Sequence, residues 1–144
     1  MEDLTAISDQ ELRSRLMEKE ELVDLALHVG GIGMWDWRLD PNSDTPFGGT
    51  VHWDKQMYEL FGTTPATWGG TFQAFEDCLI PEDRAAVRDA VSASIGADAP
   101  YDYSFHLTNG KYIRGKGRVF RDADGRAVRM VGVCVEDKIQ TLKP

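Results

Sequence analysis

The residues of this chain that could take part in chemistry are few and far apart in the sequence. His28, His52 and His106 are each candidate axial ligands for a haem iron. His28 ends a predicted helix, and the other two fall in predicted strands. A lone histidine in such a place is more often a surface or hydrogen-bonded residue. We therefore favour that interpretation and keep haem binding as the alternative.

The remaining reactive groups also lack the spacing of a known site. Cys78 and Cys134 show no CxxC or Cys/His pattern, so neither a disulfide framework nor a zinc site is indicated, and inert buried thiols are favoured. Gly30-Gly31-Ile32-Gly33 follows a helix instead of opening one, which predicts a helix stop and not a phosphate loop. Four acids are candidate catalytic groups, but no pair of them has the spacing of a hydrolase or kinase signature. These acids are Asp36, Asp54, Glu82 and Asp83. The sequence predicts no catalytic residue and no metal site.

Length and charge narrow the function classes further. A chain of 144 residues fits one ordinary domain. The net charge of −8 disfavours nucleic acid and anionic membranes as partners, because both are negatively charged. The sequence has neither a signal-peptide pattern after Met1 nor an apolar run long enough to span a bilayer. We therefore expect a cytoplasmic protein.

Residues 8–29 are predicted to form an amphipathic helix. Ser8 and Glu11 have the spacing of a capping box, and Gly30 and Gly31 end the segment. Apolar residues recur at intervals of three and four, which is typical of a weak heptad suited to a two-helix contact. The apolar positions taken as an interface are Leu12, Leu16, Val23 and Ala26.

Strands and short helices follow this segment. Residues 34–39 alternate with both tryptophans on one face, and residues 50–53 form a second short strand. Caps at Asp54 and Thr71 predict helices over 55–61 and 72–79. A third helix starts at Pro81 and is expected to stop at Gly96.

The last third is a predicted three-stranded meander over residues 101–107, 111–121 and 128–135. Asn109-Gly110 gives a strong hairpin signal, and a second turn ends at Gly125. Arg114, Lys116 and Arg118 share one face of the middle strand. The final strand is apolar on both faces, so its outer side needs a cover, either the leading helix or the same helix of a second subunit. Val131 and Val133 are therefore added to the predicted interface.

This order of elements resembles that of a PAS domain, of the subgroup common in bacterial sensor histidine kinases. Six motifs carry the resemblance, over about residues 33–136. They are Gly33-Met34-Trp35-Asp36-Trp37, Trp53 with Tyr58-Glu59-Leu60-Phe61-Gly62, Ile80-Pro81-Glu82-Asp83-Arg84, Asn109-Gly110-Lys111-Tyr112-Ile113-Arg114, Asp122-Ala123-Asp124-Gly125, and Gly132-Val133 in the last strand.

The resemblance implies an α+β PAS fold, with an antiparallel five-stranded sheet, short helices on one face and an amphipathic N-terminal helix. The expected parts are a dimerisation or signalling helix at 1–29, the PAS domain at 30–138 and a tail at 139–144. Of the family's Asp-Ile-Thr signal-transfer motif, Glu136 keeps the acid. Ile80, His106 and Asp137-Lys138 depart from the family pattern where relatives connect the fold to the signal.

The resemblance also implies a function. We expect a sensory or regulatory module in a histidine-kinase two-component pathway, as kinase input domain or single-domain adaptor, forming a homodimer and contacting a signalling protein such as the kinase. A haem or flavin sensor of gas, redox state or light is the alternative. Cys78, however, lies in a segment unlike the flavin-reactive Asn-Cys-Arg-Phe motif.

The place where a PAS core can hold a small ligand is between the helices and the inner face of the sheet, where glycines in one strand leave room. A filled core is the favoured interpretation, since protein interiors rarely leave voids. No cofactor is predicted, and the identity of any small ligand is left open. The pocket positions are Trp37, Trp53, Tyr58, Phe61, Phe105, Ile113, Gly115 and Gly117.

Overall fold

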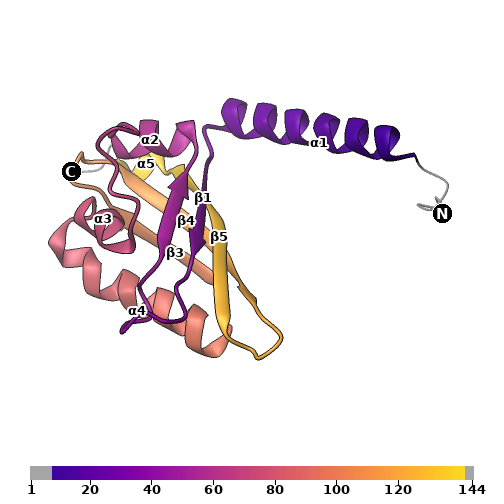
Figure 1. Ribbon diagram of the computed structural model, residues 1–144. Helices are drawn as coiled ribbons and strands as arrows, with labels where there is room; N and C mark the ends of the chain where they lie inside the picture. The colour runs from indigo at the N-terminus through magenta and orange to yellow at the C-terminus, as the bar shows by residue number, and fades with distance from the viewer. Residues whose placement is uncertain (1–7, 142–144) are drawn as a thin grey trace. The chain divides into compact units, whose positions relative to one another are not determined.

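The computed structural model describes residues 8–141 and divides into two compact units, one ending at Gly31 and the other beginning at Ile32 (Figure 1). Residues 1–7 of the predicted N-terminal segment and residues 142–144 of the predicted tail lie outside the described residues. The division falls two residues after the predicted domain boundary at residue 29. The functional roles of the three parts stay predictions.

The first unit is a single helix, α1 (Asp9–Gly30). Ser8 starts it, because the Ser8 hydroxyl accepts a hydrogen bond from the Glu11 backbone N–H at 3.1 Å. Gly31 ends it in the left-handed conformation, with φ of 65°. Both predicted helix signals are thus confirmed. No residue of α1 is buried.

The second unit contains a five-stranded antiparallel sheet in the order β2-β1-β5-β4-β3 (Figure 1). The first and last strands of the chain therefore pair at the centre, and β3 and β2 form the edges. The bounds lie close to those predicted: β1 (Gly33–Arg38), β2 (Thr50–Trp53), β3 (Tyr101–His106), β4 (Tyr112–Arg121) and β5 (Ala127–Glu136).

Helices α2 (Lys55–Phe61), α3 (Phe72–Asp77) and α4 (Pro81–Ala97) follow β2 and pack on one face of the sheet, here called the inner face. The predicted caps are confirmed: Asp54 accepts from the N–H of Met57 at 3.0 Å, and Thr71 from the N–H of Ala74 at 3.1 Å. The predicted α+β architecture is therefore present, with one short helix, α5 (Lys138–Thr141), that the sequence did not predict.

Two helix ends differ from the prediction. Helix α3 ends at Asp77 and not at residue 79, because Leu79 forms an isolated β-bridge with Leu107. Helix α4 continues through Gly96 to Ala97. The Arg121 side chain donates to the Ile95 carbonyl at 2.6 Å. This bond satisfies one of the carbonyl groups that have no partner within the last turn of a helix. Gly96 is therefore not the helix stop that we expected.

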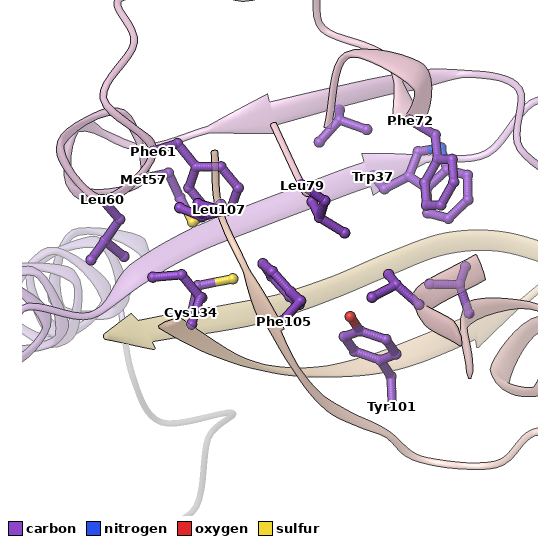
Figure 2. Packing of buried hydrophobic residues seen from close by; sticks show 14 of the residues in the cluster. Trp37, Met57, Leu60, Phe61, Phe72, Leu79, Tyr101, Phe105, Leu107 and Cys134 are labelled. Carbon is purple, nitrogen blue, oxygen red and sulfur yellow. The ribbon is translucent and has the colours of Figure 1, made fainter. Parts of the chain in front are cut away.

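The hydrophobic core lies between the inner face and the three helices. Figure 2 shows Phe105 near its middle, with Phe61 on one side and Trp37 and Phe72 on the other. Trp37 and Phe72 stack with ring centroids 5.1 Å apart, and Phe61 and Phe105 approach to 6.3 Å. These contacts join β1, β3, α2 and α3 in one cluster.

Candidate functional site

A small apolar cavity lies inside this core, between the inner face and helices α2, α3 and α4. Its volume is about 40 Å³. An engineered apolar cavity of about 150 Å³ takes up benzene, so this one is too small for an aromatic ring without rearrangement. The side chains that line it are Trp35, Trp37, Val51, Trp53, Met57, Phe72, Phe75, Val91, Tyr101, Phe105, Met130 and Cys134.

Trp35 determines the shape of the sheet side of this cavity. One row of paired residues crosses all five strands: Trp53, Trp35, Gly132, Gly117 and Tyr101. An added Cβ would lie 2.2 Å from the indole at Gly132 and 2.5 Å from it at Gly117. The Trp35 side chain therefore lies over both glycines and meets the Tyr101 ring edge-on, with centroids 6.2 Å apart.

The polar groups at the cavity wall are neutral. Burial raises the pKa of the Tyr101 hydroxyl well above its usual value, and burial raises the pKa of the Cys134 thiol to about 12. Neither group ionises near pH 7. Figure 2 shows both side chains inside the cluster. The cavity therefore suits an uncharged guest and gives no compensation for a charged one.

Three of the eight predicted pocket residues line the cavity, namely Trp37, Trp53 and Phe105. Phe61 and Ile113 are buried in the core cluster outside the cavity wall. Tyr58 packs against Trp53 with centroids 5.8 Å apart. The binding of a ligand by any of these residues stays a prediction.

The two predicted pocket glycines lie on the inner face but leave little free space. The Cβ position at Gly115 lies 3.3 Å from the Tyr101 ring, and the Cβ position at Gly117 meets Trp35. Their missing side chains therefore accommodate neighbouring aromatic rings. Trp35 and Cys134 line the cavity but were not among the predicted pocket residues, although alternation along their strands places both on the inner face with Gly132.

The three histidines lie away from the cavity wall. His28 and His52 are exposed, and His106 is about half exposed with its Nδ1 2.9 Å from the Asp83 carboxylate. Cys78 lies after α3, where burial raises the pKa of its thiol. Among residues 8–141, no cluster of three or more His, Cys, Asp or Glu side chains has the arrangement of a metal site.

The opposite, outer face of the sheet presents apolar side chains at its centre. Val131 pairs with Asp36 and Arg118, and Val133 pairs with Met34 and Lys116. Both valines are half-buried and point outward, because they alternate with the inner-face residues Met130 and Cys134. We call Met34, Val131, Val133, Val135 and Phe120 the outer apolar patch; Met34 and Phe120 are each 42% exposed.

Basic residues surround this patch. Arg129 binds Asp36 with two hydrogen bonds of 3.1 and 2.7 Å, and the Arg129 hydrogen bond holds the pKa of Asp36 below its usual value. Arg114 binds Asp102 in the same way at 3.1 and 3.0 Å. The predicted basic stripe is therefore real but largely paired. Arg118 is the exception, because its guanidinium contacts the Phe120 ring at 5.7 Å.

In the other unit, α1 exposes the predicted interface residues. Leu12, Leu16 and Val23 are 45%, 53% and 48% exposed. Ala26 is also exposed. No helix in the part of the chain that the structure describes combines the length and apolar character needed to cross a membrane. Helix α1 thus offers apolar side chains along with many acidic ones.

The end of the sheet differs from what the family motif implies. Glu136 is the last residue of β5, and its carboxylate has no hydrogen-bond or ion-pair partner within residues 8–141. Asp137 instead caps α5, accepting from the Gln140 N–H at 3.0 Å. This cap was not predicted, although an acid three residues before the N–H that it accepts from is a cap signal. The predicted signal-transfer role of Glu136 stays a prediction.

Comparison with known proteins agrees with this architecture. A family model described as the PAS fold matches residues 50–134, more than half of the chain. An Escherichia coli K12 protein described as a probable diguanylate cyclase, DgcE, is 28% identical over 140 residues. The match covers 94% of this chain but only 12% of that protein.

Two solved structures show the same fold at low sequence identity. A sensory box histidine kinase/response regulator from Burkholderia thailandensis superposes with a TM-score of 0.65 and 21% identity, covering 82% of this chain and 86% of that one. The N-terminal domain of a diguanylate cyclase with a PAS/PAC sensor from Marinobacter aquaeolei gives a TM-score of 0.62 and 14% identity, covering 76% and 97%. Effectors of two kinds therefore carry domains of this fold.

Proposed function

Because the chain belongs to the PAS fold family, we propose that it is a sensory or regulatory module that controls a bacterial signalling enzyme by protein contact. The outer apolar patch carries this proposal. A patch of apolar side chains on a sheet face, ringed by charges, is typical of a protein interface. The proposal assigns no catalytic step to the chain itself.

We propose that the module is a homodimer in which both α1 and the outer apolar patch take part. No residue of helix α1 is buried, so its apolar side chains gain stability when they pack against a further surface, which we propose is supplied by the second subunit. The outer face and the helix also differ in charge. Cations outnumber acids on the outer face, where Asp36 and Asp102 lie among five basic residues, while acids outnumber bases along α1. The basic residues are Arg38, Arg114, Lys116, Arg118 and Arg129. Such a difference favours correct docking and a high association rate.

Replacing Val131 by glutamate should weaken the dimer at least about tenfold, because an unpaired carboxylate would be buried in the contact. Light scattering and sedimentation of the full chain over a concentration series would measure this. Val133→Glu should behave alike, since the two side chains share the outer face. A chain lacking residues 1–28 should also dissociate.

Ser92→Glu provides the matched control, because Ser92 is exposed on α4, away from the outer face. It should leave the dimer intact. A monomeric wild-type chain, or equal dissociation constants for Val131→Glu and Ser92→Glu, would contradict the proposed interface.

The effector is proposed to be a histidine kinase, which the chain serves as input domain or single-domain adaptor. A diguanylate cyclase is the second candidate, favoured by the match to DgcE over 94% of this chain. Two chimeras distinguish the candidates. In each, residues 1–144 replace the matching segment of the Burkholderia kinase or of DgcE, and autophosphorylation or cyclic di-GMP formation is measured.

The wild-type segment should change the output of one chimera relative to a deletion of that segment, and Val131→Glu should abolish the change. If both chimeras match their deletions, the regulatory proposal fails. A response in the cyclase alone would replace the kinase by the cyclase as effector.

We further propose that the module works without haem or flavin and that any ligand is small and uncharged. The cavity volume of about 40 Å³ and the neutral groups Tyr101 and Cys134 support this. The absorption spectrum of the purified protein should therefore show only the ultraviolet band of tryptophan and tyrosine, without a haem or flavin band in the visible range. A Soret or flavin band that copurifies in stoichiometric amount would establish the cofactor sensor instead.

A further inference from the structure

One cross-strand pair at the end of the β3–β4 hairpin connects two separate parts of the domain. His106 on β3 lies opposite Tyr112 on β4. The His106 N–H donates to the Asp83 carboxylate at 2.7 Å, and the His106 carbonyl accepts from the Ile80 N–H at 3.1 Å. Both backbone groups of His106 therefore bind the start of α4 and not the neighbouring strand.

Tyr112 makes the corresponding contacts on the other side. Its N–H donates to the Thr141 hydroxyl at 2.9 Å, and its carbonyl accepts from the Asp137 N–H at 2.9 Å. Asp137 precedes the single turn of α5 and Thr141 is its last residue, and they also bind each other through the Thr141 N–H and the Asp137 carbonyl at 3.0 Å. The docking of α5 on the sheet thus depends on the backbone of Tyr112.

The side chains of His106 and Tyr112 contact each other and so connect the hydrogen bonds to α4 with the hydrogen bonds to α5. In antiparallel sheets, a pair that exchanges no backbone hydrogen bonds brings its side chains close together. The His106 and Tyr112 rings lie 4.5 Å apart between centroids. Asp83 also fixes the position of the imidazole. The His106 Nδ1 lies 2.9 Å from the same Asp83 oxygen that accepts the hydrogen bond from the His106 backbone N–H.

We propose that Asp83, His106, Tyr112 and Thr141 form a coupling chain that links the position of α4 to the docking of α5. Helix α4 contributes Val91 to the cavity wall, so a change in cavity filling moves the helix that carries Asp83. The ring contact then transmits that displacement to Tyr112 and to the C-terminal turn. A regulatory role for these four residues rests on the proposed sensory function. The coupling between α4 and α5 does not depend on that function.

Amide hydrogen exchange in the full chain tests the coupling without any ligand or partner. In Asp83→Ala, the amides of Tyr112, Asp137 and Thr141 should exchange about fivefold faster or more, at the lower end of typical coupling between sites. Coupling is reciprocal, so Thr141→Val should likewise speed exchange of the His106 amide, although Thr141 has no hydrogen bond to His106 in the structure of residues 8–141.

Three controls separate coupling from loss of structure. Asp102→Ala removes an exposed ion pair from the same strand, β3, and should change exchange at α5 less than twofold. Asp83→Asn keeps an acceptor for the His106 N–H and should restore near wild-type exchange. The Val133 amide, in the central strand β5, reports global opening, and the exchange rates at α5 are compared after correction for any change there.

Unchanged exchange at Tyr112, Asp137 and Thr141 in Asp83→Ala, or an equal effect of Asp102→Ala, would overturn the coupling chain. Failure of the proposed function shows itself differently, as chimeras that match their deletions while the exchange results stand. The two claims therefore fail in separate experiments.

Discussion

Replacing Gly132 by alanine is expected to lower the free energy of unfolding by about 3 kcal/mol or more, as overpacking of a rigid site does at its upper end. The new Cβ would lie 2.0 Å from the Lys116 carbonyl oxygen on β4 and 2.2 Å from the Trp35 indole. A backbone atom cannot move away without breaking the β4–β5 pairing. Urea denaturation followed by circular dichroism would measure the loss.

Two other glycines of the inner face provide the comparison series. At Gly115 the nearest atom to a new Cβ is the Tyr101 ring at 3.3 Å, so Gly115→Ala should cost less than about 1 kcal/mol. At Gly117 the close contacts of 2.5 and 2.8 Å are both with the Trp35 side chain. Combining Gly117→Ala with Trp35→Leu should therefore recover much of the loss, since adjacent substitutions are not additive.

The same Trp35→Leu background should not rescue Gly132→Ala, because the Lys116 carbonyl remains in place. Equal rescue at both positions would show that the indole alone restricts this surface. A Gly132→Ala variant as stable as Gly115→Ala would contradict the close packing of β4 and β5 described above.

Phe105→Ala is expected to cost about 3–5 kcal/mol, the usual range for removing a buried phenylalanine. Phe105 is 1% exposed and lines the cavity beside Phe61 and Phe75. The truncation should enlarge an existing void of about 40 Å³ into one that admits a benzene ring. Saturating benzene should therefore raise the melting temperature of Phe105→Ala but not that of the wild type.

Phe120→Ala provides the matched control, because it deletes the same side chain from the outer face, where Phe120 is 42% exposed. Its cost should stay below about 1 kcal/mol, and benzene should have no effect. If Phe105→Ala does not fold, Phe105→Leu gives a smaller loss that can be measured in the same way. A benzene response in the wild type would show that the native cavity already accepts a ring.

Local signals in the sequence were sufficient to predict most elements. Ser8, Asp54 and Thr71 cap helices as expected, since a cap depends only on residues three positions away. Alternation placed Trp35 and Trp37 on one face of β1, and that face is the inner one. The single five-stranded antiparallel sheet followed from the resemblance to the PAS family and not from periodicity, and its strand order was not predicted.

Features that depend on distant partners could not be predicted. Helix α4 continues past Gly96, and Arg121 at the end of strand β4 binds carbonyl groups in its last turn. The contact over Gly117 could not be foreseen for the same reason, since the indole that lies there belongs to β1. The coupling contacts of Asp83 and Thr141 likewise join residues that are far apart in the chain. Sequence patterns indicate which face a residue takes, but not what it meets there.

The central pairing of β1 with β5 has a consequence for how the chain is made. Met34 is synthesised well before its partner Val133, which lies far along the chain. The β3–β4–β5 meander pairs strands that are neighbours in the sequence. The β1–β2 hairpin, by contrast, joins the sheet only through the pairing of β1 with β5. Non-local pairing slows folding and leaves strand edges open in the meantime. During translation, one edge of the tryptophan-rich β1–β2 hairpin thus has no partner strand until β5 has been made.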